Sequence, residues 1–339
     1  MKLTDKIYVA GHRGLVGSAI VRALQKQGYQ NIIIRTHSEL ELMDKSAVDS
    51  FFKQIKPDYV FLAAAKVGGI WANDNYPADF IYQNLQIQNN VIHAAYENQV
   101  KRLLFLGSSC IYPRHCPQPI KEEYLLTGLL EATNRPYALA KIAGIEMCWS
   151  YNRQYGTKYL AVMPTNLYGP GDNYDLNTSH VIPALIRKMH EAKEAKAKEV
   201  VVWGTGTPRR EFLYSDDLAD ASLFLMNLND PHFEELINSK EIAPLVNIGC
   251  GEDVTIAELA ALIAKVVGFE GAISYDTSKP DGTPRKLLNV DKIQGLGWVA
   301  RTSLADGMKV AYGEFKKTLF KNNLFNINNE QLQVEVKGA

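Results

Sequence analysis

Tyr137 and Lys141 stand four positions apart at the start of a segment with a helical pattern, so both side chains should project from one face, one turn apart. An ammonium about 6 Å from a phenol, at an effective dielectric of about 20, favours the phenolate by about 3 kcal/mol, or about two pKa units. We therefore expect a lowered pKa for Tyr137, as suits an acid that gives up its proton near neutral pH. Ser108 could donate a hydrogen bond to the same substrate oxygen.

A glycine-rich loop precedes this set in the sequence. It joins the apolar run 7–10 to a helical pattern, and its members are Gly11, His12, Arg13, Gly14, Leu15, Val16 and Gly17. Glycines at such a junction permit a tight turn, a close approach to a pyrophosphate and close packing of helix on strand, while the helix N-terminus offers free N–H donors. The spacing is G-x-x-G-x-x-G rather than G-x-G-x-x-G, and a plain turn is the alternative. At the first strand-to-helix junction we expect a dinucleotide site.

The charges near this loop favour one dinucleotide. Proteins that select NAD usually end the second strand with an acidic residue that accepts from the ribose hydroxyls, whereas this chain has Arg35 there and Arg13 inside the loop. Two cations suit a 2′-phosphate, so we expect NADPH. Each arginine alone could also be an ordinary solvated side chain.

Alternating apolar runs and helical patterns must position these residues. Strands are expected at 7–10, 32–35, 59–64, 103–107 and 160–164, and helices at 15–27, 46–55, 77–98 and 136–155. This order predicts an α/β fold of the Rossmann type, a doubly wound parallel sheet covered on both faces, with ligands at the carboxyl ends of the strands.

The alternation loosens after residue 164, which predicts a smaller, interleaved C-terminal substrate domain. Helices are expected at 180–198 and 255–267, with a strand at 200–203, and a buried strand at 246–249 could rejoin the main sheet. The predicted domains are 1–175 for the dinucleotide, rejoined by about 215–250, and a discontinuous 176–321 for the substrate. Residues 322–339 form a polar tail without a clear apolar face.

Composition excludes several classes of protein. The 339 residues include 37 Lys and Arg against 37 Asp and Glu, and this zero net charge argues against a nucleic-acid partner. The longest apolar run, 59–65, is far shorter than the roughly 20 residues that span a bilayer, and no signal-type stretch precedes the first strand. We therefore expect a cytoplasmic protein without a membrane partner. Four cysteines without a C-x-x-C pair should be free thiols.

Eight blocks of sequence resemble the extended short-chain dehydrogenase/reductase superfamily, and more specifically its GDP-L-fucose synthase family. The resemblance covers about residues 5–315, and its blocks are 11–18, 63–70, 76–84, 104–112, 136–144, 163–170, 179–184 and 279–287. It implies an NADPH-dependent enzyme that epimerises GDP-4-keto-6-deoxy-D-mannose at carbons 3 and 5 and then reduces the carbon 4 ketone. It further implies a homodimer and no metal.

The resemblance assigns roles to five residues. In the final step Tyr137 would protonate the alkoxide at carbon 4, Ser108 would orient it, and Lys141 would also hold the nicotinamide ribose. For the inversions, which need titratable groups on both sides of the sugar ring, the matching positions are Cys110 and His180. A thiolate near a protonated histidine or lysine has a lowered pKa, which suits a base.

The same resemblance implies further contacts. Besides the glycine loop and Arg35, the cofactor would be touched by Leu106, Gly107, Ser108, Ser109, Tyr137, Lys141, Pro164, Thr165, Asn166, Leu167 and His180. The GDP-sugar would be held by Lys188, Trp203, Arg210 and Asp281, whose cations suit a diphosphate and whose indole suits a base or sugar. Physics alone does not choose between Arg210 and Arg209.

The chain departs from the family at His37, where a second arginine is usual. Cys116, Cys148 and Cys250 receive no role, and the last two are expected to be buried.

Two other functions share parts of this pattern. An NAD-retaining nucleotide-sugar 4-epimerase or 4,6-dehydratase has the same fold and Tyr–Lys pair, but Arg35 disfavours NAD and the dehydratases tend to carry acidic residues where this chain has Ser109 and Cys110. A regulatory NADPH sensor would be expected to lack part of the catalytic set, which is complete here.

Overall fold

A six-stranded parallel sheet organises the larger part of the molecule. The computed structural model describes residues 1–176, 178–279 and 281–336. The strand order is β2-β1-β3-β4-β5-β9, and every neighbouring pair is parallel. The strands are β1 (Lys6–Ala10), β2 (Asn31–Ile33), β3 (Tyr59–Leu62), β4 (Arg102–Leu106), β5 (Tyr159–Pro164) and β9 (Leu245–Ile248). The Rossmann-type doubly wound fold is confirmed, and the order reverses between β1 and β3, where such sheets bind ligands.

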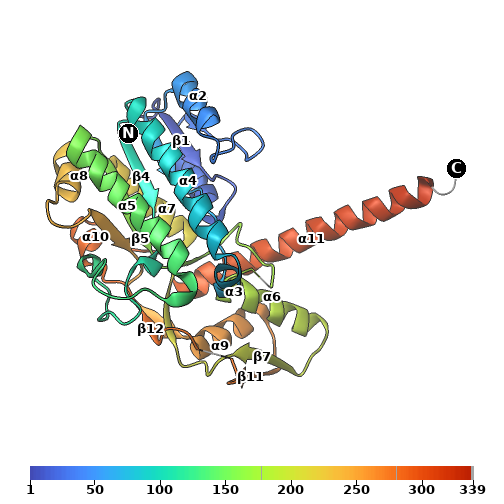
Figure 1. Cartoon of the computed structure of the whole chain (residues 1–339). Coiled ribbons are helices and arrows are strands. Elements are labelled where there is room, and N and C mark those ends of the chain that lie inside the picture. Colours follow the sequence, from blue (N-terminus) through green and yellow to red (C-terminus); the bar gives the residue numbers. More distant parts are fainter. Residues whose placement is uncertain (177, 280, 337–339) are drawn as a thin grey trace.

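Helices cover the sheet in two layers (Figure 1). On one side α4 (Pro77–Glu97) packs against α5 (Arg135–Tyr155) and α2 (Lys45–Ile55), and on the other α1 (Leu15–Lys26) packs against α7 (Ser215–Asn227). Each helix turns an apolar stripe to the sheet, as Ala19, Ile20 and Leu24 do in α1. Shorter helices are α3 (Ile70–Asn75), α8 (Asp230–Ile237) and α10 (Asp291–Gly295), with 3-10 turns η1 (Ser109–Ile111), η2 (Glu122–Tyr124) and η3 (Ala132–Asn134).

Smaller sheets and two helices surround a second apolar cluster. One sheet runs β10-β8-β12, with β6 also paired to β8, and another pairs β11 with β7. The strands are β6 (Asn166–Tyr168), β7 (Glu199–Trp203), β8 (Arg209–Tyr214), β10 (Asp253–Thr255), β11 (Ala272–Asp276) and β12 (Arg285–Lys286). The helices α6 (Val181–Glu194) and α9 (Ile256–Val267) contribute Ile186 and Ile263 to this cluster. Two separate hydrophobic clusters fit the predicted pair of domains, whose boundaries stay a prediction.

Most expected elements form, with shifted ends. The run 246–249 does rejoin the main sheet, since β9 pairs with β5. The expected strand 32–35 stops at Ile33, so Arg35 lies beyond it, and the expected helix 180–198 stops at Glu194 because Lys196 takes a left-handed conformation (φ 53°). Helix α11 (Leu304–Val336) continues through the backbone of the expected polar tail, and Figure 1 shows its far half extending away from both clusters. Residues 337–339 of that tail lie outside the described residues. No helix in the described ranges has the length and apolar character needed to cross a bilayer.

Candidate active site

The glycine loop forms a close-packed cradle at the point where the strand order reverses. Gly11 has φ +84°, and a Cβ on it would lie 2.7 Å from the backbone of Ala64, the segment that follows β3. A Cβ on Gly17 would lie 2.1 Å from the carbonyl oxygen of Gly11, so helix α1 contacts the loop directly. Gly14 is the N-cap of α1, and no described side chain caps it. This open N-terminus of a 12-residue helix fits a pyrophosphate.

The two predicted cations lie together near the end of β2. The Arg35 guanidinium donates to the carbonyl of Ile34 at 2.7 Å and lies 5.5 Å from the centroid of the Phe51 ring. Arg13 and Arg35 both act on Glu39, whose pKa is lowered chiefly by hydrogen bonds from Thr36 and then by these two charges. No local motif in the sequence singles out Glu39.

His37, the departure from the family, is exposed and engaged by a neighbour. Its Nε2 lies 2.8 Å from Oε2 of Glu41, four residues further along the chain. In this structure the ring therefore faces a carboxylate, and recognition of a 2′-phosphate would rest on Arg13 and Arg35.

The structure brings Ser108, Tyr137 and Lys141 together. Ser108 follows β4 and caps η1, Tyr137 and Lys141 come from the first turns of α5, and the Ser108 hydroxyl lies near enough to Tyr137 to act on its pKa. The Lys141 ammonium lies 5.8 Å from the centroid of the Tyr137 ring. Only 3% of Lys141 is exposed, and its ammonium donates to the carbonyl of Leu106 at 2.8 Å.

The expected lowering of the Tyr137 pKa is wrong for the protein without ligands. Burial raises the pKa of Tyr137 above its ordinary value, the charge of Cys110 adds to this, and the Ser108 hydrogen bond opposes it. Burial also lowers the pKa of Lys141 to about 8. The simple Coulomb argument omitted desolvation, which penalises both charged forms here.

Cys110 lies in η1, two residues after Ser108. The thiol is buried, the backbone N–H of Cys110 donates to the Ser108 hydroxyl at 3.4 Å, and the same hydroxyl acts on the pKa of the thiol. Burial raises the pKa of Cys110, against the expected lowering, while Lys286, Ser108 and Lys141 act in the other direction. The thiol thus shares one hydroxyl with Tyr137.

His180 is the N-cap residue of α6, as its expected position at a helix start requires. Desolvation lowers its pKa below the ordinary value, and the charge of Lys286 lowers it further. The same ammonium therefore acts on both His180 and Cys110, which lie 70 positions apart in the sequence and on different elements.

The remaining cofactor candidates lie at the carboxyl ends of β4 and β5. Leu106 ends β4, and Gly107 follows it at a point where a Cβ would lie 2.4 Å from the sulfur of Met163. Thr165 donates to the carbonyl of Glu211 at 3.2 Å and Asn166 donates to it at 2.8 Å, so both side chains join this edge to β8. The other members of this edge are Ser109, which is buried in η1, Pro164, which ends β5, and Leu167, which lies in β6.

Three of the four substrate candidates, Lys188, Trp203 and Asp281, lie near one another in the smaller part of the molecule. Trp203 ends β7 with 66% of its surface exposed, and the Lys188 ammonium lies 5.3 Å from its ring centroid. Asp281 accepts from the backbone N–H of Thr205 at 2.7 Å and from its hydroxyl at 2.8 Å, so the loop that carries Asp281 is tied to the turn after Trp203.

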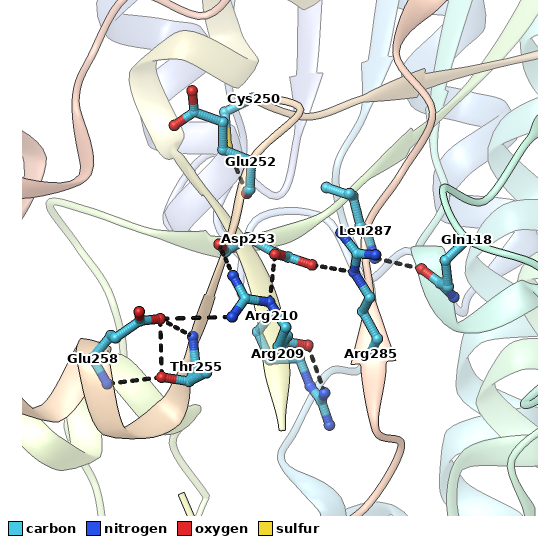
Figure 2. Close-up of polar contacts among 10 residues, drawn as sticks. All are labelled: Gln118, Arg209, Arg210, Cys250, Glu252, Asp253, Thr255, Glu258, Arg285 and Leu287. Carbon is cyan, nitrogen blue, oxygen red and sulfur yellow. Dashed lines mark hydrogen bonds and ion pairs between the residues drawn. The ribbon is translucent and has the colours of Figure 1, made fainter. Parts of the chain in front are cut away.

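The structure separates Arg209 from Arg210. Arg209 is bound to Asp253 at 2.8 Å and lies 3.9 Å from Glu258, and Figure 2 shows it turned toward these carboxylates. Arg210 donates to the carbonyl of Arg209 at 2.8 Å, and burial lowers its pKa while the charge of Asp281 opposes this. Arg210 is the arginine that lies near Asp281, which favours it for the substrate.

Sequence reasoning missed two lysines. The Lys279 ammonium lies 5.6 Å from the Trp203 ring centroid, so this ring has a second lysine beside it in addition to Lys188. The charge of Lys286 acts on Cys110 and His180. Both lysines belong to the segment 279–287, which resembles the family but contains no local pattern that assigns a role to either lysine. The cysteines without roles are free, but only Cys148 is fully buried, since Cys250 is half-buried. The described residues hold no group of three His, Cys, Asp or Glu that could bind a metal ion.

Comparisons with known proteins show which family and which folds the whole chain is similar to. The model of the NAD dependent epimerase/dehydratase family matches residues 7–238. The chain is 58% identical over 314 residues to GDP-L-fucose synthase 1 of Arabidopsis thaliana, across 93% of this chain and 94% of that protein. A GDP-6-OMe-4-keto-L-xylo-heptose reductase from C. jejuni matches with a TM-score of 0.88 and 42% identity, covering 94% of this chain and 99% of that one. A GDP-L-fucose synthetase from Naegleria fowleri bound to NADP matches with a TM-score of 0.83 and 27% identity, covering 94% and 96%.

Proposed function

The chain belongs to the NAD dependent epimerase/dehydratase family and, within it, to the GDP-L-fucose synthases, and we propose that it converts GDP-4-keto-6-deoxy-D-mannose to GDP-L-fucose with NADPH. The observation that carries this proposal is the cluster of Ser108, Cys110, Tyr137 and Lys141 at the same edge of the sheet as the glycine cradle. The cluster provides a proton donor for reduction and a thiol for epimerisation within one site.

The cradle fits a dinucleotide, because a Cβ on Gly11 or Gly17 would collide with the backbone and the N-terminus of α1 is open to an anion. When bound, NADPH supplies the hydride that reduces the carbon 4 ketone. Arg13 and Arg35 would hold the 2′-phosphate, as two guanidinium groups near the end of β2 can. The carboxyl ends of β4 and β5 would line the nicotinamide side.

Reduction of the ketone leaves an alkoxide that needs one proton. Tyr137 would give it, since its raised pKa keeps the phenol protonated until the substrate arrives. Ser108, which acts on the pKa of Tyr137, would orient the substrate oxygen, and the Lys141 ammonium beside the ring would stabilise the phenolate that forms.

Epimerisation requires a proton to leave one face of the sugar and another to arrive on the opposite face. The carbon 4 ketone acidifies the hydrogens on carbons 3 and 5, so an enolate forms at each centre in turn. We assign the deprotonation to Cys110 and the reprotonation to His180, which enter the site from η1 and from the start of α6. The free thiol would be a poor base with its raised pKa, so it needs cationic neighbours.

The nucleotide part would lie across the smaller sheets. Lys188 and Arg210 supply cations for the diphosphate, the exposed Trp203 supplies a flat apolar face, and Asp281 a carboxylate. The smaller part of the molecule would then serve as the substrate domain, in keeping with its separate apolar cluster.

We also propose a cytoplasmic homodimer. Helices α4 and α5 pack together and expose Tyr82 (61%) and Leu139 (44%) near their N-terminal ends, two apolar side chains that a second copy could cover. All four cysteines are free, which suits a reducing compartment.

One experiment tests the activity directly. Purified protein mixed with GDP-4-keto-6-deoxy-D-mannose and NADPH should consume NADPH and release GDP-L-fucose, identified by NMR of the sugar. Release of a sugar that is reduced at carbon 4 but not inverted at carbons 3 and 5 would show that the protein is a reductase without epimerase activity. No reduction with NADPH, together with turnover by a retained NAD, would favour the 4-epimerase or dehydratase alternative.

A further inference from the structure

A cavity beside the proposed base contains a lysine that the mechanism above does not use. Cys110 of η1 and Lys286 of β12 both line this cavity, together with Glu131 and Arg285. Lys286 is half-buried, and burial is the largest cause of its lowered pKa. An ammonium in such a position needs a partner for its charge.

Strand register explains why Lys286 and Arg210 share a face. Strand β12 runs parallel to β8 with Arg285 beside Arg209 and Lys286 beside Arg210. Side chains alternate between the two faces of a sheet, so Arg209 and Arg285 lie on one face while Arg210 and Lys286 lie on the other. The charge of Arg210 accordingly acts on Lys286.

A carboxylate fixes the first of these faces. Asp253 of β10, with a side chain only 4% exposed, accepts from Arg209 Nε at 2.8 Å and from Arg285 Nε at 2.5 Å (Figure 2). We call Arg209, Asp253 and Arg285 the Asp253 clamp. Burial alone would raise the pKa of Asp253, but the two guanidinium groups outweigh it and lower that pKa. The clamp joins three strands and so holds Lys286 and Arg210 on the opposite face.

The other edge of β12 is tied to the segment that follows Cys110. Gln118 accepts from the backbone N–H of Leu287 at 2.9 Å, as Figure 2 shows, and the N–H of Ile120 donates to the carbonyl of Leu287 at 2.7 Å. The position of Lys286 relative to Cys110 is therefore set by hydrogen bonds on both sides of its strand.

The charges around the thiol come from several elements. Lys286 is the foremost charge that favours the Cys110 thiolate, and in return Cys110 is the foremost charge that favours the Lys286 ammonium. Lys141 of α5 acts on the thiol in the same direction. Lys286 is also acted on by Arg210, Cys116 and Glu131, and it acts on His180 in turn. The remaining titratable groups nearby are Tyr137 of α5 and, in the cavity wall, Arg114 and Arg285.

We propose that the Lys286 ammonium, held in the shared cavity by the Asp253 clamp, stabilises the thiolate of Cys110. Lys286 is thus a positioning residue for the epimerisation, and the inference rests on the role given to Cys110 in the proposed function. The proton that leaves the thiol passes to solvent before the substrate binds. The thiolate and the ammonium then form a charge pair, and either charge would be costly if it were buried without the other. The charge of the same ammonium also lowers the pKa of His180, so protonated His180 gives up its proton more readily.

The test is a titration of the thiolate absorbance at 240 nm, taken as the difference between each enzyme and the same enzyme carrying Cys110→Ser. We expect Lys286→Met to raise the pKa of the thiol by at least about one pH unit. Lys286→Arg, which keeps the charge, should restore most of the shift. Asp253→Asn should raise the pKa by a smaller amount, and Glu258→Gln, which removes the distant partner of Arg209, should leave it unchanged.

A second measurement guards against a misfolded variant. The rate of alkylation by iodoacetamide at Cys110, read peptide by peptide, should fall about tenfold in Lys286→Met at pH 8, as one pKa unit requires. Cys250 serves as the internal reference, because Glu211 and Glu252 are the charges that act on it. A Lys286→Met thiol that titrates like the wild type would overturn the proposal. No substrate is used, so failure here is separate from failure of the GDP-sugar assay.

Discussion

Tyr137 has two partners that suit a proton donor, the Ser108 hydroxyl and the Lys141 ammonium. We predict that Tyr137→Phe loses at least about 100-fold in NADPH consumption, the scale of a general acid. Solvent deuterium should still enter carbons 3 and 5, because the inversions do not need the phenol. Both readouts come from one incubation in D2O, followed by absorbance at 340 nm and NMR of the sugar. Tyr76→Phe, which alters an exposed ring (50%), should match the wild type; retained reduction in Tyr137→Phe would remove this role.

Cys110 belongs to the same cluster as Ser108 and should affect the other half of the reaction. Cys110→Ser replaces the thiol with a hydroxyl of much higher pKa, so we expect deuterium exchange at carbons 3 and 5 to fall at least about 100-fold. NADPH binding should persist, as measured by fluorescence. Cys148→Ser is a poor control because Cys148 is buried in the core among apolar side chains, where a hydroxyl would destabilise the fold. Cys116→Ser is the better control because Cys116 is half-buried. Unchanged exchange would exclude Cys110 as the base.

Arg35 should decide between the two nicotinamide dinucleotides. Loss of a charge-assisted contact with the 2′-phosphate costs about 1.5–3 kcal/mol, so Arg35→Ala should lower kcat/KM for NADPH by about 10- to 100-fold. The value for NADH, which lacks that phosphate, should change little and is the internal control. Wild-type enzyme that uses both cofactors equally would contradict the charge argument.

The sequence supported this much of the site because its signals are local. Three glycines before a helix and a Tyr–Lys pair one turn apart are visible in a short stretch, and the structure brings Ser108 to the pair as expected. Lys286 was missed because its contact with Cys110 joins positions 176 apart and no local pattern encodes it. The pKa of Tyr137 was wrong because burial is a property of the whole fold.

At the scale of elements, the packing of α1 on the glycine loop yields a stability prediction. A Cβ on Gly17 would lie 2.1 Å from the Gly11 carbonyl oxygen, which is backbone and cannot rotate away. We expect Gly17→Ala to lower the free energy of unfolding by at least about 1–3 kcal/mol, as measured by chemical denaturation. Gly313→Ala is the matched control in another helix, where a Cβ meets open space, and it should raise stability by about 0.5–1 kcal/mol. Equal effects of the two changes would rule out close packing as the cause.

The long elements were predictable, and the short strands were not. Buried runs such as Tyr159–Pro164 and amphipathic helices such as Leu15–Lys26 show their periods over many residues. Strand β12 consists of Arg285 and Lys286 alone, two charged residues without any alternation, and it forms only because β8 lies beside it. The strands that hold the Asp253 clamp therefore depend on tertiary pairing.

At the scale of the molecule, β8 links the two apolar clusters. Its Leu213 belongs to the cluster of the main sheet, while Phe212 and Tyr214 on the opposite face belong to the second cluster. The same strand carries Arg209 and Arg210 and pairs with β12. The groups we assign to the nucleotide and the groups we assign to the reaction are thus connected through one strand, which fixes their separation.

The surface of α4 and α5 permits a last prediction, on assembly. Tyr82 and Leu139 are exposed apolar side chains near the N-terminal ends of these two helices, and a copy related by a two-fold axis would place the same surface against itself. Lysines at Tyr82 and Leu139 would then meet their own symmetry mates, so the double variant Tyr82→Lys/Leu139→Lys should elute as a monomer by light scattering where the wild type elutes as a dimer. Val299→Lys, at an equally exposed apolar site (51%) elsewhere, should stay dimeric. A double variant that remains dimeric, or a wild type that is a monomer, would show that this surface of α4 and α5 is not the interface.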